Sequence, residues 1–318
     1  MHLSMVVPCF NEEHGVQRLH DALVAALSGA TRDYEVILVD DGSTDRTLDE
    51  ARRLNEHDPR FRYVSLSRNF GKESAMLCGL RHARGDRVAL LDADLQHPPA
   101  LLPRMLVLLD TGYDQVVARR SRSGDRPWRT ALSRTYYRLA RRFLDVRLQD
   151  GAGDFRVLSR RAVDALLLLP EQHRFSKGLF AWIGFDTGCV TYRNVPREIG
   201  ASRWRPSALV DHGVDGLTSF NDHPLRPALY LGPLAFAFGG VAAAIVDGPQ
   251  RWAAALLGSA GIEVFLLGVL GEYVGRTCAE VRQRPHYLVK ESSPAPVDLR
   301  AAELVPGSGL VPGPGLVS

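Results

Sequence analysis

The chain has 318 residues, of which 45% are hydrophobic and 24% are charged, and its formal net charge is +3 at pH 7. This length suits one large domain with an appendage, or two domains. The small net charge gives no reason to expect a nucleic acid as a partner.

Residues 1–118 alternate short apolar runs with helical patterns, which is typical of a mostly parallel, doubly wound sheet flanked by helices. No GxGxxG follows a strand, and Gly71-Lys72-Glu73-Ser74 lacks the upstream glycine of a Walker loop. Both a dinucleotide-dependent dehydrogenase and a P-loop kinase are therefore disfavoured. Strands are expected at 3–8, 34–39, 61–66, 86–91 and 114–118, and helices at 14–28, 44–57, 72–83 and 99–110.

Two of the apolar runs end in pairs of carboxylates. The second run leads into Asp40 and Asp41, and the fourth leads into Asp92 and Asp94. Ligands of an open α/β sheet bind beyond the carboxyl ends of its strands, so both pairs are expected to face one crevice. Carboxylates this close repel unless a divalent cation or a ring of donors lies between them. We interpret the pattern as a metal-assisted site for a nucleotide diphosphate, with Mg²⁺ or Mn²⁺ as the metal that suits oxygen ligands.

Residues 119–142 carry nine arginines and one acid, and a hydrophobic stripe at helical spacing begins at Trp128. The stripe predicts an amphipathic helix, which either packs on the domain core or lies at a membrane surface where arginines meet lipid phosphates. A second stretch of this kind runs from Leu209 to Phe220.

Two long apolar segments follow. Residues 228–246 contain no charge, and residues 252–271 contain only Glu263. Each is close to the roughly 20 residues that cross a bilayer as a helix. Arginines flank the pair on both outer sides, so a membrane hairpin would have both ends in the cytoplasm. A buried helical hairpin in a soluble core is the alternative.

The membrane interpretation divides the chain into five parts. They are a catalytic domain 1–205, an interfacial amphipathic region 206–226, a transmembrane hairpin 227–275, a cytoplasmic segment 276–292 and a disordered tail 293–318.

Short motifs follow one another along almost the whole chain. They are Val6-Val7-Pro8-Cys9-Phe10-Asn11-Glu12-Glu13, Val39-Asp40-Asp41-Gly42-Ser43-Thr44-Asp45, Arg68-Asn69-Phe70-Gly71-Lys72-Glu73, Asp92-Ala93-Asp94-Leu95-Gln96-His97-Pro98-Pro99, Gly153-Asp154-Phe155-Arg156, Arg174-Phe175-Ser176-Lys177-Gly178, Trp182-Ile183-Gly184-Phe185, Ser202-Arg203-Trp204, Asp215-Gly216-Leu217-Thr218-Ser219-Phe220 and Gly271-Glu272-Tyr273-Val274-Gly275-Arg276. This ordered set resembles the family 2 glycosyltransferases of the polyprenyl-phosphate type. Dolichol-phosphate mannosyltransferases and bacterial undecaprenyl-phosphate glycosyltransferases are the enzymes it looks most like.

The resemblance implies a GT-A fold, which is Rossmann-like, and a site for a nucleotide sugar of the UDP-glucose or GDP-mannose class. Asp40 matches the residue that reads the base. The residues expected to bind the nucleotide sugar are Pro8, Asn11, Glu12, Asp40, Asp41, Lys72 and Asp92.

The resemblance also implies the reacting groups. Asp92 and Asp94 match a metal-binding Asp-x-Asp motif, and Asp154 matches an acid beside the reaction centre. A helix cap or turn is the alternative role for Asp154. Arg119, Arg134 and Arg203 match basic positions that hold the acceptor phosphate, so the expected catalytic residues are Asp94, Asp154, Arg119, Arg134 and Arg203.

Three positions depart from the family pattern. His97 stands where an aspartate is common, Arg203 stands where a lysine is common, and Glu263 stands where a neutral polar residue is usual. An arginine forks onto phosphate better than a lysine, so the two are not interchangeable.

The implied reaction is an inverting, metal-dependent displacement at the anomeric carbon by undecaprenyl or dolichyl phosphate. A phosphate monoester has a second pKa of about 6 and needs no strong base, so Asp154 is expected to orient rather than to abstract a proton. The enzyme would lie in the cell membrane through two helices, with its catalytic domain on the cytoplasmic side and with homo-oligomerisation left open. The alternatives are a family 2 enzyme that acts on a saccharide acceptor in cell-envelope polysaccharide synthesis, and a catalytically inactive membrane-binding module. Gly200 stands where processive synthases carry the Gln of Gln-x-x-Arg-Trp, which disfavours the first alternative.

Overall fold

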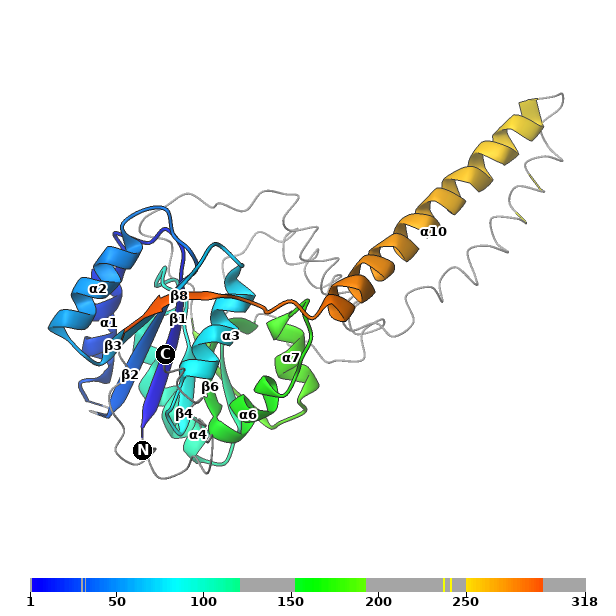
Figure 1. The fold of residues 1–318 in the computed structure, drawn as a ribbon. Coiled ribbons are helices and arrows are strands. Elements are labelled where there is room, and N and C mark those ends of the chain that lie inside the picture. The colour runs from blue at the N-terminus through cyan, green and yellow to red at the C-terminus, as the bar shows by residue number, and fades with distance from the viewer. Residues whose placement is uncertain are drawn as a thin grey trace, which may run out of the picture.

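The computed structural model describes residues 2–29, 31, 33–120, 152–192, 237, 241 and 250–293. The expected alternation of strands and helices is present, and it builds one eight-stranded sheet (Figure 1). The strands are β1 (Leu3–Cys9), β2 (Tyr34–Asp40), β3 (Phe61–Leu66), β4 (Arg87–Leu90), β5 (Gln115–Arg120), β6 (Ala152–Ser159), β7 (Thr187–Tyr192) and β8 (Val289–Ser292). The helices are α1 (Val16–Leu27), α2 (Thr47–His57), α3 (Lys72–His82), the 3₁₀ turn η1 (Pro99–Leu101), α4 (Leu102–Asp110), α6 (Arg160–Leu167), α7 (Ser176–Trp182) and α10 (Gln250–Arg282).

The sheet is mostly parallel, with the order β7-β5-β6-β4-β1-β2-β3-β8. Only β6 and β8 run antiparallel to their neighbours among these strands. The carboxyl ends of β1, β2, β3 and β4 therefore lie at one edge of the sheet, and the start of β6 lies at that same edge. This arrangement confirms the α/β fold class that the sequence predicts.

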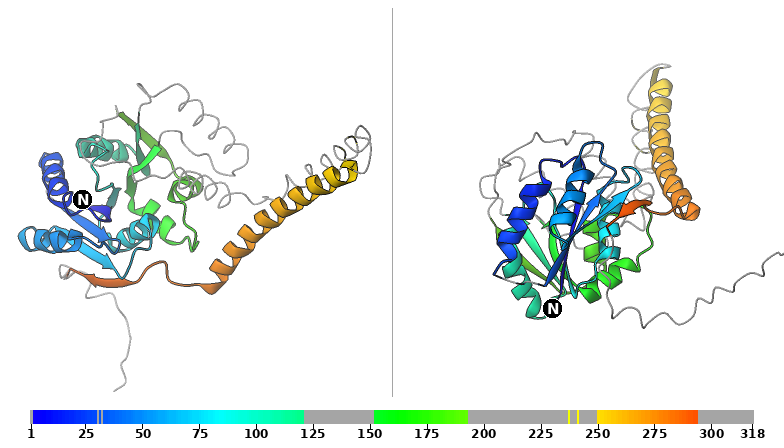
Figure 2. Two further views of the ribbon diagram at one scale, coloured as in Figure 1. Left: turned by 90° about the horizontal axis from the view of Figure 1, so that it is seen from above. Right: turned by 60° about the vertical axis from the view of Figure 1, so that its left-hand side comes forward.

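Helices cover both faces of the sheet (Figure 1, Figure 2). Side chains alternate across a strand, so Met5 and Val7 of β1 face the layer of α1, α2 and α4, whereas Val6 faces the layer of α3, α6 and α7. Burial of these two apolar clusters is the main favourable contribution to the fold.

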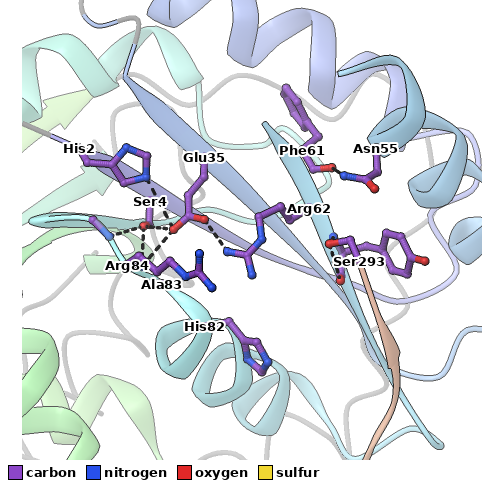
Figure 3. Close-up of polar contacts among 12 residues, drawn as sticks. His2, Ser4, Glu35, Asn55, Phe61, Arg62, His82, Ala83, Arg84 and Ser293 are labelled. Carbon is purple, nitrogen blue, oxygen red and sulfur yellow. Dashed lines mark hydrogen bonds and ion pairs between the residues drawn. The ribbon is translucent and has the colours of Figure 1, made fainter. Parts of the chain in front are cut away.

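A buried polar network ties the amino ends of the central strands together, away from the edge just described (Figure 3). Glu35 accepts a hydrogen bond from the Ser4 hydroxyl at 2.6 Å, and it forms an ion pair with Arg62 at 2.5 Å. Burial alone would raise the pKa of Glu35, but the bonds from Ser4, the Arg84 backbone and Arg62 lower it overall. Both oxygens of the Glu35 carboxylate accept hydrogen bonds within this network, so the role of Glu35 is structural.

The helix α10 spans 33 residues and extends away from the sheet (Figure 1). It contains the second apolar segment, 252–271, whereas the first, 228–246, lies outside the described residues except for positions 237 and 241. Within the described part of the chain, no helix is long and apolar enough to cross a membrane.

After α10 the chain returns to the sheet as β8, an edge strand that the sequence analysis does not predict. It pairs antiparallel with β3, and Glu291 forms an ion pair of 2.7 Å with Arg52 of α2. Ser293 follows it and is buried, with its backbone N donating to Tyr63 O at 2.9 Å. The expected tail begins at 293, but the described chain is packed up to that residue; residues 294–318 lie outside the described part.

Candidate active site

The loops that follow β1 and β2 are bonded to each other. Asn11 has a positive φ of 55°, its backbone N donates to Ser43 Oγ at 2.9 Å, and its side-chain oxygen accepts from Thr44 N at 2.9 Å. The Glu12 backbone N donates to Thr47 Oγ1 at 2.8 Å. The helices begin after these bonded loops, α1 at Val16 and α2 at Thr47, rather than at the predicted positions 14 and 44. The bonds hold Asn11 and Glu12 at the carboxyl edge of the sheet.

Asp40 and Asp41 are almost fully buried, and they use their carboxylates within the protein. Asp40 accepts bonds from Ser65 Oγ at 2.8 Å and from Ser43 N at 3.1 Å. Asp41 accepts bonds from the backbone N of Phe70 at 2.7 Å and of Gly71 at 2.9 Å, immediately before α3. Burial raises the pKa of Asp41, and the two backbone donors act against that rise.

The sequence analysis left a divalent cation or a ring of donors as the group that compensates each acidic pair, and for Asp41 the structure shows two backbone donors. Throughout the described ranges, no group of three or more His, Cys, Asp or Glu is placed to hold a metal ion.

A lysine–carboxylate cluster (Lys72, Asp92 and Asp154) lies at the carboxyl edge of the sheet. The Lys72 Nζ is 2.6 Å from Asp92 Oδ1 and 2.5 Å from Asp154 Oδ2. Lys72 is the first residue of α3, Asp92 follows β4, and Asp154 is near the start of β6, so the cluster joins three separate segments. The antiparallel register of β4 and β6, with Leu90 opposite Arg156, brings the two acids together.

The opposite charges in this cluster shift the pKa values of its members. Burial alone would lower the pKa of Lys72, but Asp154 and Asp92 raise it above its usual range. Burial alone would raise the pKa of Asp154, but Lys72 and Lys177 hold it well below its usual range. Asp154 is therefore a carboxylate at every physiological pH, and it is a weak proton acceptor.

The turn after β4 carries Asp94 and His97. Asp94 Oδ1 accepts from Gln96 N at 3.1 Å, and Leu95 between them has a positive φ of 54°, which is uncommon for a leucine. The His97 ring bonds through Nδ1 to the Tyr192 hydroxyl and packs over Gly153, where a Cβ would come within 3.0 Å of it.

Burial lowers the pKa of His97, and the charges of Asp92, Asp94 and Asp154 act against this lowering.

Three residues near the cluster have no role in the sequence-based prediction: Arg156, Lys177 and Glu73. Arg156 is buried, its guanidinium lies 3.5 Å above the Phe180 ring, and burial lowers its pKa to about 10. Lys177 and Glu73 come from α7 and α3. Their positions follow from tertiary packing, which no local pattern in the sequence signals.

The arginines expected at the acceptor are only partly within the described chain. Arg119 is exposed near the end of β5, opposite Ala152. Arg134 and Arg203 lie outside the described residues, as do most of the 119–142 segment and the 206–226 region. Pro8 is at the end of β1, opposite Val39.

Residues 4–167 match the family described as glycosyl transferase family 2. CsbB of Bacillus subtilis (strain 168), a protein named as a glycosyltransferase, is 42% identical over 92% of each chain. The bactoprenol glucosyl transferase of Shigella phage SfII is 34% identical, over 92% of this chain and 98% of its own. Among solved structures, the mannosyltransferase PcManGT from Pyrobaculum calidifontis in complex with GDP-Man and Mn²⁺ is 19% identical, with a TM-score of 0.49 over 88% of this chain and 85% of that one.

The chain therefore belongs to glycosyl transferase family 2, and it is a glycosyltransferase with a GT-A fold.

Proposed function

We propose that the enzyme transfers a hexosyl group from a nucleotide-diphosphate sugar to a polyprenyl phosphate at a membrane. The observation that carries this proposal is the lysine–carboxylate cluster at the carboxyl edge of the sheet, where ligands of such sheets bind. The names of relatives that match over nine-tenths of the chain, such as the SfII bactoprenol glucosyl transferase, support the acceptor class.

On the donor side, Asp92 and Asp94 would hold Mg²⁺ or Mn²⁺. Their donor set fits such an ion, because these cations are commonly bound by one or two carboxylates together with substrate phosphates. The bound cation would stabilise charge on the departing diphosphate. Lys72 places a second positive charge beside Asp92. The loops after β1 and β2 are bonded to each other, and their residues Asn11 and Glu12, together with Asp40, are proposed to bind the nucleoside.

On the acceptor side, a lipid phosphate monoester has a second pKa of about 6 and is a competent nucleophile at neutral pH without a strong base. The low pKa of Asp154 agrees with this, because such a group orients charge rather than removing protons. Arg119, Arg134 and Arg203 are proposed to hold the acceptor phosphate, since guanidinium groups bind phosphate in a forked geometry.

We further propose that residues 227–275 anchor the enzyme as a hairpin with both ends in the cytoplasm, preceded by an interfacial region at 206–226. The nearly uncharged composition of the two apolar segments supports this, and the exposed Leu267 and Leu270 on α10 agree with it. A homo-oligomer stays a prediction.

The experiment that tests the function incubates membranes containing the enzyme with radiolabelled UDP-glucose or GDP-mannose and then extracts them with organic solvent. We expect label from one of the two donors in the organic phase, and none with Asp92→Asn. Label in a water-soluble or polymeric saccharide would favour the polysaccharide alternative. An absence of transfer from both donors would contradict the proposal.

A further inference from the structure

A contact between Glu73 and Ser176 joins the first turns of α3 and α7 beside the lysine–carboxylate cluster. The carboxylate Oε2 of Glu73 accepts a hydrogen bond from the Ser176 backbone N at 3.1 Å and another from the Ser176 hydroxyl. The two residues are 103 positions apart in the chain, so the contact is a tertiary link. Glu73 directly follows Lys72, and Ser176 directly precedes Lys177.

Packing does not require a carboxylate at this place. Ala75 and Cys78 of α3 belong to the same apolar cluster as Leu179 and Phe180 of α7, so the two helices are already held on one face of the sheet. Burial raises the pKa of Glu73, which means that its ionised form is costly here. The contact therefore adds a directional constraint that apolar packing lacks.

The constraint acts next to the lysine that compensates Asp154. Lys72 contacts this carboxylate directly at 2.5 Å. Lys72 and Glu73 are consecutive residues in the first turn of α3. A shift of this turn relative to α7 would therefore move Lys72 relative to Asp154.

We propose that Glu73 is a positioning residue for the transfer reaction: its bonds to Ser176 hold the first turn of α3 against α7 and so keep Lys72 in contact with Asp154. This inference rests on the proposed function, because Asp154 matters only if donor and acceptor meet there. Glu73 itself touches neither substrate in this role. It works as a hydrogen-bond acceptor, so an amide oxygen can replace its carboxylate in part.

The test compares Glu73→Ala, Glu73→Gln, Ser176→Ala and the double alanine variant in the full-length enzyme. Misplacement of catalytic groups by about 1 Å can cost roughly a hundredfold in rate, so Glu73→Ala should lower kcat roughly tenfold to a hundredfold and leave both KM values nearly unchanged. Glu73→Gln keeps an acceptor oxygen and should retain kcat within about threefold of wild type. The double variant should be no slower than Glu73→Ala, because the two residues act as one unit.

A similar pair at the other end of the sheet serves as the control. Asp114, just before β5, accepts from the hydroxyl of Ser159 at the end of β6 at 2.9 Å, and it also accepts from the guanidinium of Arg161. Asp114→Ala should lower Tm as Glu73→Ala does, but it should leave kcat unchanged. An unchanged kcat in folded Glu73→Ala, equal losses in the Gln and Ala variants, or an additive double variant would overturn the proposal.

A second measurement does not depend on transfer. Amide hydrogen exchange over residues 176–179 should speed up in Glu73→Ala and stay near wild type in Glu73→Gln. If the wild-type enzyme transfers no sugar, the proposed function is wrong, and unchanged exchange in Glu73→Ala would still refute the positioning role on its own.

Discussion

Replacing Asp41 tests whether this carboxylate holds the loop before α3 or contacts the nucleotide. The side chain is 3% exposed and accepts two backbone hydrogen bonds, from Phe70 and Gly71. Each buried donor left unsatisfied costs about 1–3 kcal/mol, and these two are partly buried, so Asp41→Ala should lose roughly 2–4 kcal/mol. In a domain of this size the loss corresponds to a decrease in Tm of roughly 5–15 °C.

The assay is thermal unfolding of the full-length protein by circular dichroism, combined with steady-state kinetics. We expect kcat to fall together with Tm, because the loop leads directly into Lys72. The control is Asp21→Asn, since Asp21 lies exposed on α1 and bonds only to neighbouring side chains among the described contacts. A Tm unchanged in Asp41→Ala, accompanied by a raised KM for the donor, would refute the structural role and support direct contact with the nucleotide.

Three further predictions concern the metal site, Asp154 and the turn at Gly42. Asp94→Asn should abolish transfer, and EDTA should do so reversibly with Mg²⁺ or Mn²⁺; full activity after either treatment would reject this metal site. Asp154 has a depressed pKa, so its ionised form and its contribution to stability are complete above the unfolded value of about 3.9 and are lost only as pH falls through the folded value. Lys177→Ala should raise that pKa and move the midpoint of acid unfolding, followed by circular dichroism, to higher pH. Lys290→Ala on β8 should leave the midpoint unchanged, and an identical shift in both variants would contradict a specific effect on Asp154. Gly42 has a φ of +66°, and a Cβ there would lie 2.3 Å from a backbone carbon, so Gly42→Ala should lower the unfolding free energy by more than about 3 kcal/mol, and a loss below about 1 kcal/mol in urea titration would contradict this packing.

The strands and helices of residues 1–118 follow from local pattern, because short apolar runs alternate there with segments of helical pattern. The later strands do not. The segment Val289–Ser292 has only one apolar residue, and it becomes β8 because the open edge of β3 offers backbone partners to it. A pairing across more than 200 residues leaves no local signal.

The candidate site shows the same division. Acids at strand ends place Asp92 near the expected edge, and the structure brings it together with Lys72 and Asp154. Their roles stay predictions. The sequence left open whether a cation or a ring of donors compensates Asp41, because sequence cannot show which backbone donors a buried carboxylate reaches. It also gave no role to Glu73, whose contact with Ser176 depends on how α7 packs.

The most direct test of the central claim is mass spectrometry of the lipid product. The purified full-length enzyme in vesicles would receive undecaprenyl phosphate, Mg²⁺ and the nucleotide sugar selected by the labelling experiment. We predict a lipid heavier than the acceptor by one hexosyl residue, which mild acid cleaves back to polyprenyl phosphate and free sugar. An unchanged acceptor, with the hexose recovered on a saccharide, would contradict the assignment of a lipid phosphate as the nucleophile.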